Sequence, residues 1–528
     1  MSSPDTTRAA TDHTITVADC IERHARNRPD APALIEPFGR TVDYRELDHS
    51  SRALAAGLRK LGAQRGTRIA TFVDDSAAYV ELYIGAARIG AVMVPINTRL
   101  TATEVSVLVE DCDPLIVVWT GKHTAVMNDV PTEGRVSVVL DGDRSVPGSV
   151  AFEDLVSTPV DDAETPDLDA DDPYIIGYTS GTTGRPKGAV LTHRTVRAIA
   201  ESNTAAYRLP RHSVAALTGS MSFVATVPAH VLTHLRIGGA IVILGPWTVE
   251  SLLNAVKQYS VTFTYVPSPV IDEFVETVTA SPERIATLCT VLHSASNAGP
   301  EKLRALYDAV GDRLVEGLGM TENSGGLVTA TREGDFEPSS AASEPFRSVG
   351  RAVDGTEVDV RDENGAPIPH DGVSVGEIVV RSPALMTGYW NMPDATARSL
   401  VDGWYHTGDL GSMDAAGFVY VSDRRTDLIV SGGMNVYPSE VESTVAAHPA
   451  VAECAIVGAP HPRWGQSVVA VVVLVDGARL TLADLQGHCR KSLASYKKPT
   501  RLVIMDSLPR TTSMKIKRNV VRDAVLAG

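Results

Sequence analysis

Apolar and polar positions recur with two different periods along the chain, and each period predicts a type of element. From Val42 to Gly62 leucines recur at helical spacing behind Asp43 and Glu46, which predicts a helix that opens with a capping box. Short apolar runs at Arg68–Val73 and Ala91–Ile96 predict strands, and a helical stretch separates them. Strand–helix–strand alternation of this length indicates parallel βαβ units.

The same alternation continues through two further stretches. An acidic, proline-containing connector at 161–173 precedes a strand, and a second α/β stretch runs from about Ser213 to Thr329. After a polar loop at 331–345 the pattern turns to β-strands, and helix–strand alternation returns after Leu428. The further strands are expected at 115–119, 136–141, 174–178, 240–244, 261–266, 358–368, 376–382 and 417–423.

Composition and charge narrow the class of protein. The 528 residues are 44% hydrophobic and 21% charged, which is typical of a globular protein of two to four domains. The net charge of −16 argues against nucleic-acid and membrane partners. From Arg424 onward there are 14 basic and 8 acidic residues, so this end is basic and would suit an anionic ligand. Chance variation in surface charge explains the excess equally well.

The cysteines and the N-terminus indicate a cytoplasmic protein. The five cysteines are scattered without a CxxC spacing, so they predict neither a metal site nor a disulfide framework. Residues 1–14 are polar and lack the apolar core of a signal peptide. The longest apolar run, Val468–Val475, is far shorter than the ~20 residues that span a membrane. A reducing cytosol is the expected setting.

The stretch YTSGTTGRPKG, from Tyr178 to Gly188, is the strongest chemical signal. It matches neither the Walker A pattern nor GxGxxG. Its glycines free backbone N–H groups, its hydroxyls donate hydrogen bonds, and Lys187 adds a positive charge, so the loop suits a polyphosphate. A flexible surface turn is the alternative for the loop taken alone.

This loop, together with further motifs in a fixed order, resembles the adenylate-forming enzymes, which include acyl- and aryl-CoA synthetases, luciferases and peptide-synthetase adenylation domains. The resemblance covers nearly the whole chain and is closest in pattern to acyl- or aryl-CoA ligases. The other motifs are GMTE (319–322), GEIVVRSPALMTGYWNMPDAT (376–396), GWYHTGD (403–409), DRRTDLIVSGGMNVYPSEVE (423–442) and LPRTTSMKIKR (508–518).

The resemblance implies a two-step reaction. A carboxylate attacks the α-phosphate of ATP to give an acyl-adenylate and pyrophosphate, and a thiol, expected to be that of CoA, then displaces AMP. Lys515, Glu322 and Thr179 are the implied catalytic residues, and Glu322 and Thr179 the implied Mg²⁺ ligands. ATP and CoA are implied to bind at Thr179, Ser180, Gly181, Thr182, Thr183, Gly184, Lys187, Ser296, Asn297, Ala298, Gly317, Leu318, Gly319, Met320, Thr321, Asp409, Arg424, Gly432 and Gly433.

The resemblance also implies the domain organisation. The expected fold is α/β. Residues 1–423 form a large N-terminal domain of two βαβ-type parallel-sheet subdomains plus a β-rich subdomain, and 428–528 form a small mobile α+β domain that carries Lys515. Residues 424–427 are the implied hinge, about which the small domain rotates between the two steps. A homodimer is left open.

The sequence departs from the family pattern around the acid and the acceptor. Leu318 stands where the family has an aromatic residue that stacks on adenine. Thr426 stands at the hinge position, two after Arg424, where the family usually has Asp or Lys. Met514 replaces the glycine that precedes the catalytic lysine, Lys515. No Phe-His pair follows Gly219, and the next histidine is His230. Ser294, Ser296 and Asn297 favour a compact acid with a hydroxyl, amino or second carbonyl group, or else they bond only adenine or backbone. The implied acid pocket comprises Ser222, Phe223, His293, Ser294, Ala295 and Asn323.

Three alternatives stay open at this point. The adenylate could pass to a carrier-protein thiol or to an amine. It could also serve an unusual nucleophile, such as nitrite in a diazotisation. A protein of a different class, a catalytically inactive scaffold with the same fold, would not need Lys187, Glu322, Asp409 and Lys515 together.

Overall fold

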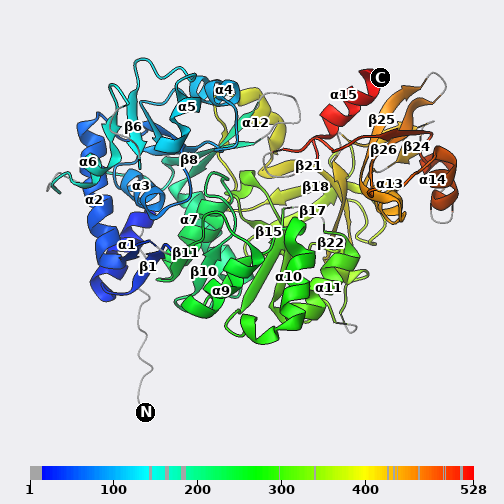
Figure 1. Cartoon of the computed structure of the whole chain (residues 1–528), viewed down its shortest axis with the longest axis horizontal. Coiled ribbons are helices and arrows are strands. Elements are labelled where there is room, and N and C mark those ends of the chain that lie inside the picture. The colour runs from blue at the N-terminus through cyan, green and yellow to red at the C-terminus, as the bar shows by residue number, and fades with distance from the viewer. Residues whose placement is uncertain are drawn as a thin grey trace, which may run out of the picture.

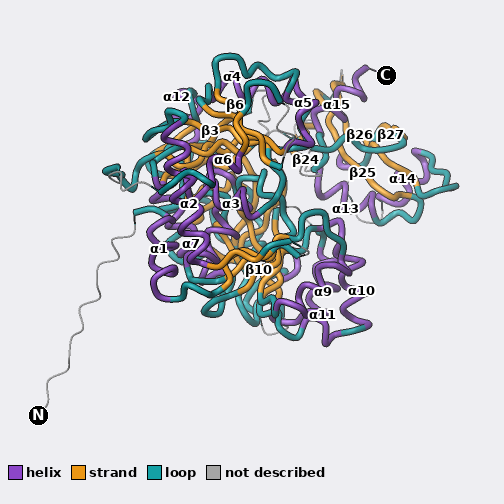
Figure 2. Tube along the Cα trace, turned by 60° about the vertical axis from the view of Figure 1, so that its left-hand side comes forward, coloured by secondary structure: helices purple, strands orange, loops and turns teal. Residues whose placement is uncertain are grey.

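The computed structural model describes residues 15–37, 39–141, 146–160, 166–179, 186–295, 298–337, 340–424, 427–431, 434–436, 438–461, 464–490, 493, 495–511 and 515–527. Within these ranges the strands form four sheets, with most helices on the outside (Figures 1 and 2). Two large sheets and a smaller β-rich sheet make up an N-terminal domain, and a smaller domain with the fourth sheet lies apart at the C-terminal end.

The first large sheet contains the strands predicted before and around the glycine-rich loop. Its described strands follow the order β19-β9-β8-β4-β3-β5-β6-β7. The pairs from β8 to β7 are parallel, and β9 and β19 are added antiparallel at one edge. The bounds are β3 Arg68–Phe72, β4 Val92–Pro95, β5 Ile116–Thr120, β6 Val136–Leu140, β7 Val150–Ala151, β8 Pro173–Thr179, β9 Lys187–Thr192 and β19 Gly388–Tyr389.

The second large sheet holds the later α/β stretch and also the beginning of the chain. Its described order is β16-β15-β14-β13-β12-β10-β11-β1-β2, and β1 lies parallel to β11 with Leu34 opposite Ile241. The local pattern gave no sign that residues near 32–43 join this sheet. The bounds are β1 Pro32–Ile35, β2 Thr41–Asp43, β10 Val214–Leu217, β11 Ala240–Ile243, β12 Phe263–Tyr265, β13 Thr290–Ser294, β14 Leu314–Gly319, β15 Leu327–Ala330 and β16 Arg351–Ala352.

Helices cover these two sheets, and one continuous apolar core with residues from both sheets joins them. Their bounds are α1 Val17–Asn27, α2 Tyr44–Lys60, α3 Ala77–Arg88, α4 Ala102–Cys112, α5 Thr124–Met127, α6 Phe152–Val156, α7 His193–Ala206, α8 Thr233–Arg236, α9 Val249–Tyr259, α10 Ile271–Ala280 and α11 Pro300–Val310. The predicted helix after Val42 is α2, and Asp43 caps it by accepting from Glu46 N at 2.8 Å. The capping-box prediction is wrong in its second half, because the Glu46 carboxylate accepts from Arg40 Nη1 at 3.4 Å instead.

The remaining two sheets confirm the change of pattern after residue 345. The β-rich sheet contains β17 Glu357–Arg361, β18 Gly376–Arg381, β20 Leu400–Val401, β21 Trp404–Met413 and β22 Val419–Arg424, all antiparallel, with α12 Pro393–Ser399 beside it. The C-terminal domain contains β23 Ile429–Ser431, β24 Met434–Val436, β25 Val451–His461, β26 Gly465–Leu474 and β27 Arg501–Ile504, with α13 Pro438–Ala446, α14 Leu482–Cys489 and α15 Arg518–Ala527. The hinge at 424–427 stays a prediction.

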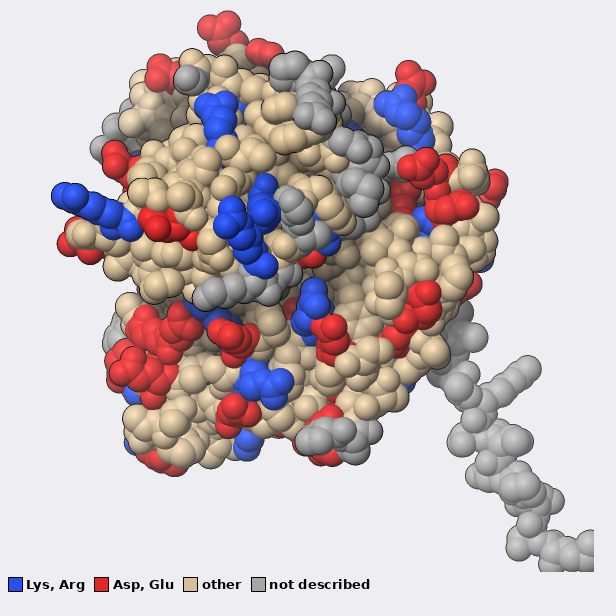
Figure 3. Space-filling view, turned by 90° about the vertical axis from the view of Figure 1, so that its right-hand side faces the viewer, with Lys and Arg blue, Asp and Glu red and all other residues tan. Residues whose placement is uncertain are grey.

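On the face shown in Figure 3, the described basic side chains do not form one continuous field. The face that the C-terminal domain presents carries basic and acidic side chains interspersed, with several basic ones near its centre (Figure 3). Among the described residues, no helix combines the length and the apolarity that crossing a membrane requires.

Candidate functional site

The glycine-rich loop is held between two hydrogen-bonded strands at the edge of the first sheet. Thr179, the last residue of β8, pairs with Lys187, the first residue of β9. Its hydroxyl lies 3.5 Å from the Lys187 carbonyl oxygen. The predicted phosphate-binding residues Ser180–Gly184 lie outside the described residues. The hairpin nevertheless places the two ends of the loop, Thr179 and Lys187, side by side.

Lys187, Tyr389 and Glu322 form a connected cluster at this hairpin. Strand β19 pairs with β9, so that Tyr389 lies opposite Ala189, and the Lys187 ammonium lies 5.2 Å from the centre of the Tyr389 ring. The Tyr389 hydroxyl donates to Glu322 Oε1 at 2.8 Å and lies 3.2 Å from the Tyr405 hydroxyl. The cluster therefore combines a cation, a carboxylate and two phenols at one place.

The two tyrosines were not among the predicted site residues, although each lies within a quoted motif. Tyr389 and Tyr405 are 7% and 5% exposed, and burial together with the Glu322 carboxylate raises the pKa of both phenols. They therefore stay protonated at neutral and moderately alkaline pH. A protonated phenol can donate to a carboxylate, so the Tyr389 hydroxyl fixes the position of the Glu322 side chain.

The short turn that carries Glu322 is fixed by backbone contacts. Glu322 lies in a 3₁₀ turn, Thr321–Asn323, that follows β14, and its carbonyl accepts from Met386 N at 2.7 Å. Asn323 is fully buried and its Nδ2 donates to Leu327 O at 3.1 Å, so its side chain braces this turn. Ser324 follows with φ 52° and donates through its hydroxyl to Ala384 O. The Glu322 carboxylate is thus presented from a rigid support.

The strand β14 reaches the site through a close approach to β15. A Cβ on Gly317 would lie 2.5 Å from Thr329 O, so only glycine fits there. Leu318 follows, half-buried against the core of the β-rich sheet, and Gly319 pairs with Leu327. Met320 is half-buried at the end of the strand. These predicted nucleotide-binding residues line up along one strand end, as expected at the carboxyl edge of a parallel sheet.

The end of the neighbouring strand β13 carries a buried hydrogen-bonded chain. His293 is fully buried; its Nδ1 lies 2.5 Å from Glu316 Oε2 and its Nε2 lies 2.9 Å from Ser268 Oγ. Burial alone would lower the pKa of His293, but the Glu316 carboxylate outweighs it and the pKa is raised. The His293 ring, predicted to line the acid pocket, is therefore committed to Glu316 and Ser268, which sequence reasoning missed.

Beyond His293 the chain turns sharply. Ser294 is half-buried, and Ala295 has φ 69°, a left-handed conformation that few non-glycine residues adopt outside functional or strained turns. The predicted residues Ser296 and Asn297 lie outside the described residues. Ala298 follows and packs partly against the core behind α11.

The loop after β10 holds the predicted pocket residues Ser222 and Phe223. Ser222 is buried and its hydroxyl lies 2.9 Å from that of Ser220, while Phe223 is half-buried. Ser220 Oγ and Met221 N both donate to Asp75 Oδ1, at 3.0 and 2.7 Å. Burial raises the pKa of Asp75 to about 6. Asp75 belongs to the first sheet's loops, so it ties the two parallel-sheet subdomains together.

Asp409 and Lys515 come from two other parts of the chain. Asp409 lies half-buried on β21 opposite Arg424, and its backbone N–H donates to Thr407 Oγ1 at 3.0 Å. Lys515 is exposed in a short hairpin that an Arg510–Ile516 bridge closes, and its N–H donates to Thr511 Oγ1 at 3.0 Å.

The hairpin of Lys515 runs beside the N-terminal domain. Glu104, on α4, has a pKa lowered by hydrogen bonds from Thr101 and by the nearby charge of Lys517. Lys517, two positions after Lys515, therefore lies near Glu104 of the N-terminal domain. Of the other predicted acceptor-side and hinge positions, Thr426, Gly432, Gly433 and Met514 lie outside the described residues, as does the Arg424 side chain.

Metal binding by protein ligands alone is not indicated. In the part of the chain that the structure describes, no group of three or more His, Cys, Asp or Glu side chains is placed to hold a metal ion. The Glu322 carboxylate and the Thr179 hydroxyl are hard oxygen donors of the kind that Mg²⁺ takes when substrate phosphates and waters complete its shell. The donor set fits a magnesium ion that arrives with a nucleotide.

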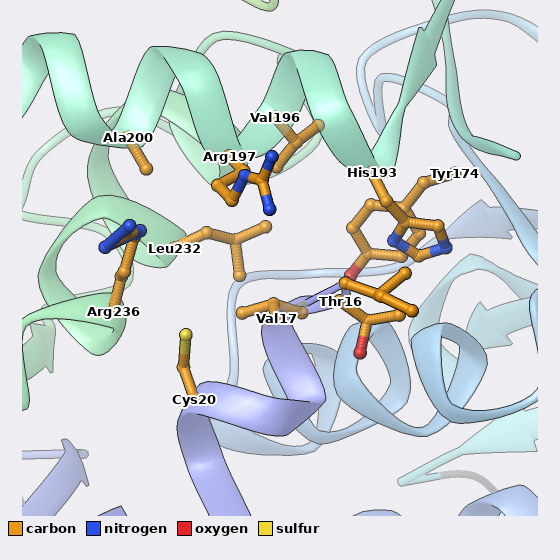
Figure 4. Close-up of a pocket in the computed structure, with 11 residues that line it drawn as sticks. Thr16, Val17, Cys20, Tyr174, His193, Val196, Arg197, Ala200, Leu232 and Arg236 are labelled. Atoms are coloured by element: carbon orange, nitrogen blue, oxygen red, sulfur yellow. The ribbon is translucent and has the colours of Figure 1, made fainter. Parts of the chain in front are cut away.

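A separate hollow between α1, α7 and α8 lies away from this cluster (Figure 4). It adjoins His193, which follows β9 at the end opposite Lys187, six residues away or about 20 Å at strand spacing. The His193 ring stacks on Tyr174 at 4.7 Å, and burial lowers its pKa to about 4. The hollow is lined by apolar side chains together with Arg197 and Arg236, and none of the predicted site residues lines it.

Comparison with known proteins identifies the class. The family model for the AMP-binding enzyme matches residues 21–390, and that for the AMP-binding enzyme C-terminal domain matches residues 440–515. The chain therefore belongs to the AMP-binding enzyme family, within the adenylate-forming superfamily, and the resemblance noted from its motifs is confirmed.

Similar proteins narrow the activity to ligases of this type. The chain is 33% identical over 512 residues to a feruloyl-CoA synthase from Amycolatopsis sp, covering 95% of this chain and 97% of the relative. It is 31% identical over 512 residues to the fatty acid–[acyl-carrier-protein] ligase ScoC of Streptomyces coeruleorubidus, covering 96% of both. ATP-bound MatB from Rhodopseudomonas palustris superposes with a TM-score of 0.86 at 28% identity, covering 96% of this chain and 98% of that one. Use of ATP by this chain follows from the family and these complexes.

Proposed function

We propose that the protein activates a carboxylic acid with ATP to an acyl-adenylate, with release of pyrophosphate, and then transfers the acyl group to the thiol of CoA. The observation that carries the proposal is the Lys187–Tyr389–Glu322 cluster at the hairpin whose loop has the composition of a phosphate cradle. Similarity to feruloyl-CoA synthase supports CoA as the acceptor.

The cluster has the chemistry that the first step needs. Phosphoryl attack spreads negative charge over the phosphate oxygens, so catalysis depends on positioned cations and hydrogen-bond donors. Lys187 would contact the departing pyrophosphate from the base of its loop, and the Tyr389 ring holds its ammonium in place. Glu322 and Thr179 would hold Mg²⁺, which when bound neutralises phosphate charge.

The remaining predicted residues complete the proposed site from other elements. Asp409 would accept hydrogen bonds from the ribose hydroxyls, with Leu318 against the adenine. Lys515 would place its ammonium between the α-phosphate and the acid carboxylate in the first step. Because Lys515 is exposed on a small separate domain, rotation about the hinge at 424–427 would exchange it for a path that admits CoA.

A carrier-protein thiol is the second candidate acceptor. Its support is the ScoC relative, whose name states a carrier-protein ligase at an identity close to that of the feruloyl-CoA synthase. Both acceptors end in the same phosphopantetheine thiol chemistry and share the first half-reaction.

Two measurements test the proposal. Labelled pyrophosphate should exchange into ATP in the presence of one class of acid in a panel of aryl, short alicyclic and fatty acids. CoA should then stimulate AMP release with formation of the thioester. AMP release that is equal without CoA, with product formed only from a carrier protein or an amine, would contradict CoA as the acceptor.

Lys515→Ala separates the two steps. The variant should lose acid-dependent exchange while it still converts a supplied acyl-adenylate to the thioester. Lys302→Ala, on the exposed face of α11, is the matched control and should behave like the wild type. Unchanged exchange in Lys515→Ala would refute the proposed role of the lysine.

A further inference from the structure

His230 is a histidine deep in the N-terminal domain whose ring has no hydrogen-bond partner among the described residues. It lies on a single π-helical turn, Val227–Leu232, between β10 and α8. Turns of this kind are uncommon and are often found at functional sites. Its carbonyl accepts from the His234 ring at 2.7 Å, so the backbone is fixed while the His230 ring stays unpaired.

Aromatic rings surround the His230 imidazole. The ring centres of Tyr207, Phe263 and Tyr265 lie 5.9, 5.5 and 6.2 Å from it. Tyr207 and Phe263 are buried, whereas His230 and Tyr265 both keep accessible surface. Burial lowers the pKa of His230 to about 3 even so. The His230 ring therefore lies deep in the domain and still keeps surface that a small molecule can touch.

The segment that precedes the π turn packs against the proposed phosphate site. A Cβ on Gly177 of β8 would lie 2.5 Å from the Val224 side chain, and one on Gly325 would lie 2.4 Å from Ala225 Cα. Val224 and Ala225 therefore pack between the strand that ends at Thr179 and the turn that follows Glu322.

Two further contacts relate the surroundings of His230 to predicted site residues. Asn203 Nδ2 donates to Ala229 O at 3.4 Å, and a Cβ on Gly326 would lie 2.9 Å from the same nitrogen. Tyr265, whose ring also faces His230, donates through its hydroxyl to Ser294 O at 3.3 Å. Asn203 thus links the segment after the Glu322 turn to the π turn that carries His230.

Neither ring nitrogen of His230 is enclosed, and neither has a hydrogen-bond partner among the described residues, so both can meet a ligand or a water. A neutral imidazole offers one N–H donor and one acceptor nitrogen. A phenol or an aromatic amine complements this pair, and the surrounding rings suit a planar aromatic body. An alkyl chain would leave the ring unpaired, and a second carboxylate would meet an uncharged imidazole.

We propose that His230 determines substrate specificity by hydrogen bonding to a hydroxyl or amino group on the ring of an aromatic carboxylic acid. The inference rests on the proposed function, because it assigns the acid of that same site. The carboxylate of the acid would lie toward Glu322 and Lys187, and the ring substituent toward the π turn. Ser222 and Phe223, where the family pattern has Phe-His, lie on the same segment.

The test compares matched acids that differ by one hydroxyl. Pyrophosphate exchange is measured with benzoic against 3- and 4-hydroxybenzoic acid, and with cinnamic against 4-hydroxycinnamic acid. The wild type should prefer the better hydroxylated partner by at least about tenfold in kcat/KM, because a site built to bond a hydroxyl rejects the analogue without it. His230→Phe should bring that ratio close to one and leave kcat/KM for the unsubstituted acid within about threefold.

Control variants keep the result interpretable. His230→Gln retains a donor and an acceptor and should restore part of the preference. His230→Leu removes both groups and carries the test if His230→Phe does not fold. His49→Phe, an exposed histidine on α2, should leave the ratio unchanged. A ratio that His230→Phe, or His230→Leu in its place, leaves at the wild-type value, as expected if only a water satisfies the ring, overturns the inference alone. Absence of exchange with every acid overturns the proposed function as well.

Discussion

Replacing Tyr389 by phenylalanine isolates one hydrogen bond in the proposed catalytic cluster. The substitution removes the hydroxyl that donates to Glu322 Oε1 at 2.8 Å and keeps the ring that faces the Lys187 ammonium. At 7% exposure, little water reaches this position to replace the lost donor. The change therefore acts on the carboxylate and leaves the cation–ring contact intact.

The size of the effect follows from the charge on the acceptor. A hydrogen bond to a charged group contributes about 1.5–3 kcal/mol, which corresponds to a loss of about 10- to 150-fold in kcat/KM. Burial and Glu322 raise the pKa of Tyr389, so the donor persists through the alkaline range and the deficit of Tyr389→Phe should not shrink up to pH 10. Pyrophosphate exchange at several pH values measures both quantities.

A matched control uses the same chemical change elsewhere. Tyr420, on β22, donates through its hydroxyl to Asp414 Oδ2 at 2.7 Å, so Tyr420→Phe also removes a phenol–carboxylate bond. It should lower stability without lowering exchange. If Tyr389→Phe keeps exchange within twofold of the wild type, Glu322 does not depend on this donor and the reasoning about the cluster is refuted.

Three further outcomes follow from the structure. The folded-state pKa of Asp75, about 6, lies above the unfolded value, so the wild type should lose up to about 3 kcal/mol of unfolding free energy as pH rises from about 4 to 6. Asp75→Asn should abolish this loss. Urea unfolding across this range checks it, and an equal loss in the variant would contradict the assignment. Glu316→Gln should destabilise by about 1–3 kcal/mol through the broken pair with His293, whereas Glu301→Gln on the exposed start of α11 should cost almost nothing; equal unfolding midpoints for the two variants would argue against the pair. Lys187→Ala should weaken exchange mainly through a higher KM for ATP, since it removes a phosphate contact, and an unchanged KM would count against that contact.

Many helices and strands could be predicted from the sequence, because the spacing of apolar residues and the length of an apolar run depend only on residues that are contiguous in the chain. The helix after Val42 and the strands at 68–73 and 91–96 appear close to their predicted bounds. The pairing of β1 with β11 was not accessible, because it joins residues about two hundred positions apart and leaves no local signal.

The same limit explains which site residues were missed. Motifs named Lys187 and Glu322, but Tyr389 joins them only through the pairing of β19 with β9. Glu316 meets His293 through the register of β13 and β14, and Asp75 meets Ser220 across two subdomains. These partners depend on tertiary packing, so a single sequence shows their residue types without showing their contacts.

Acid-dependent exchange of pyrophosphate into ATP by the wild type and by Glu322→Gln tests the central claim most directly. The account predicts exchange with at least one class of acid, reduced by about 100-fold or more in Glu322→Gln and unchanged in the matched variant Glu301→Gln. Exchange that Glu322→Gln leaves at the wild-type rate would contradict the assignment of this cluster as the site of adenylation.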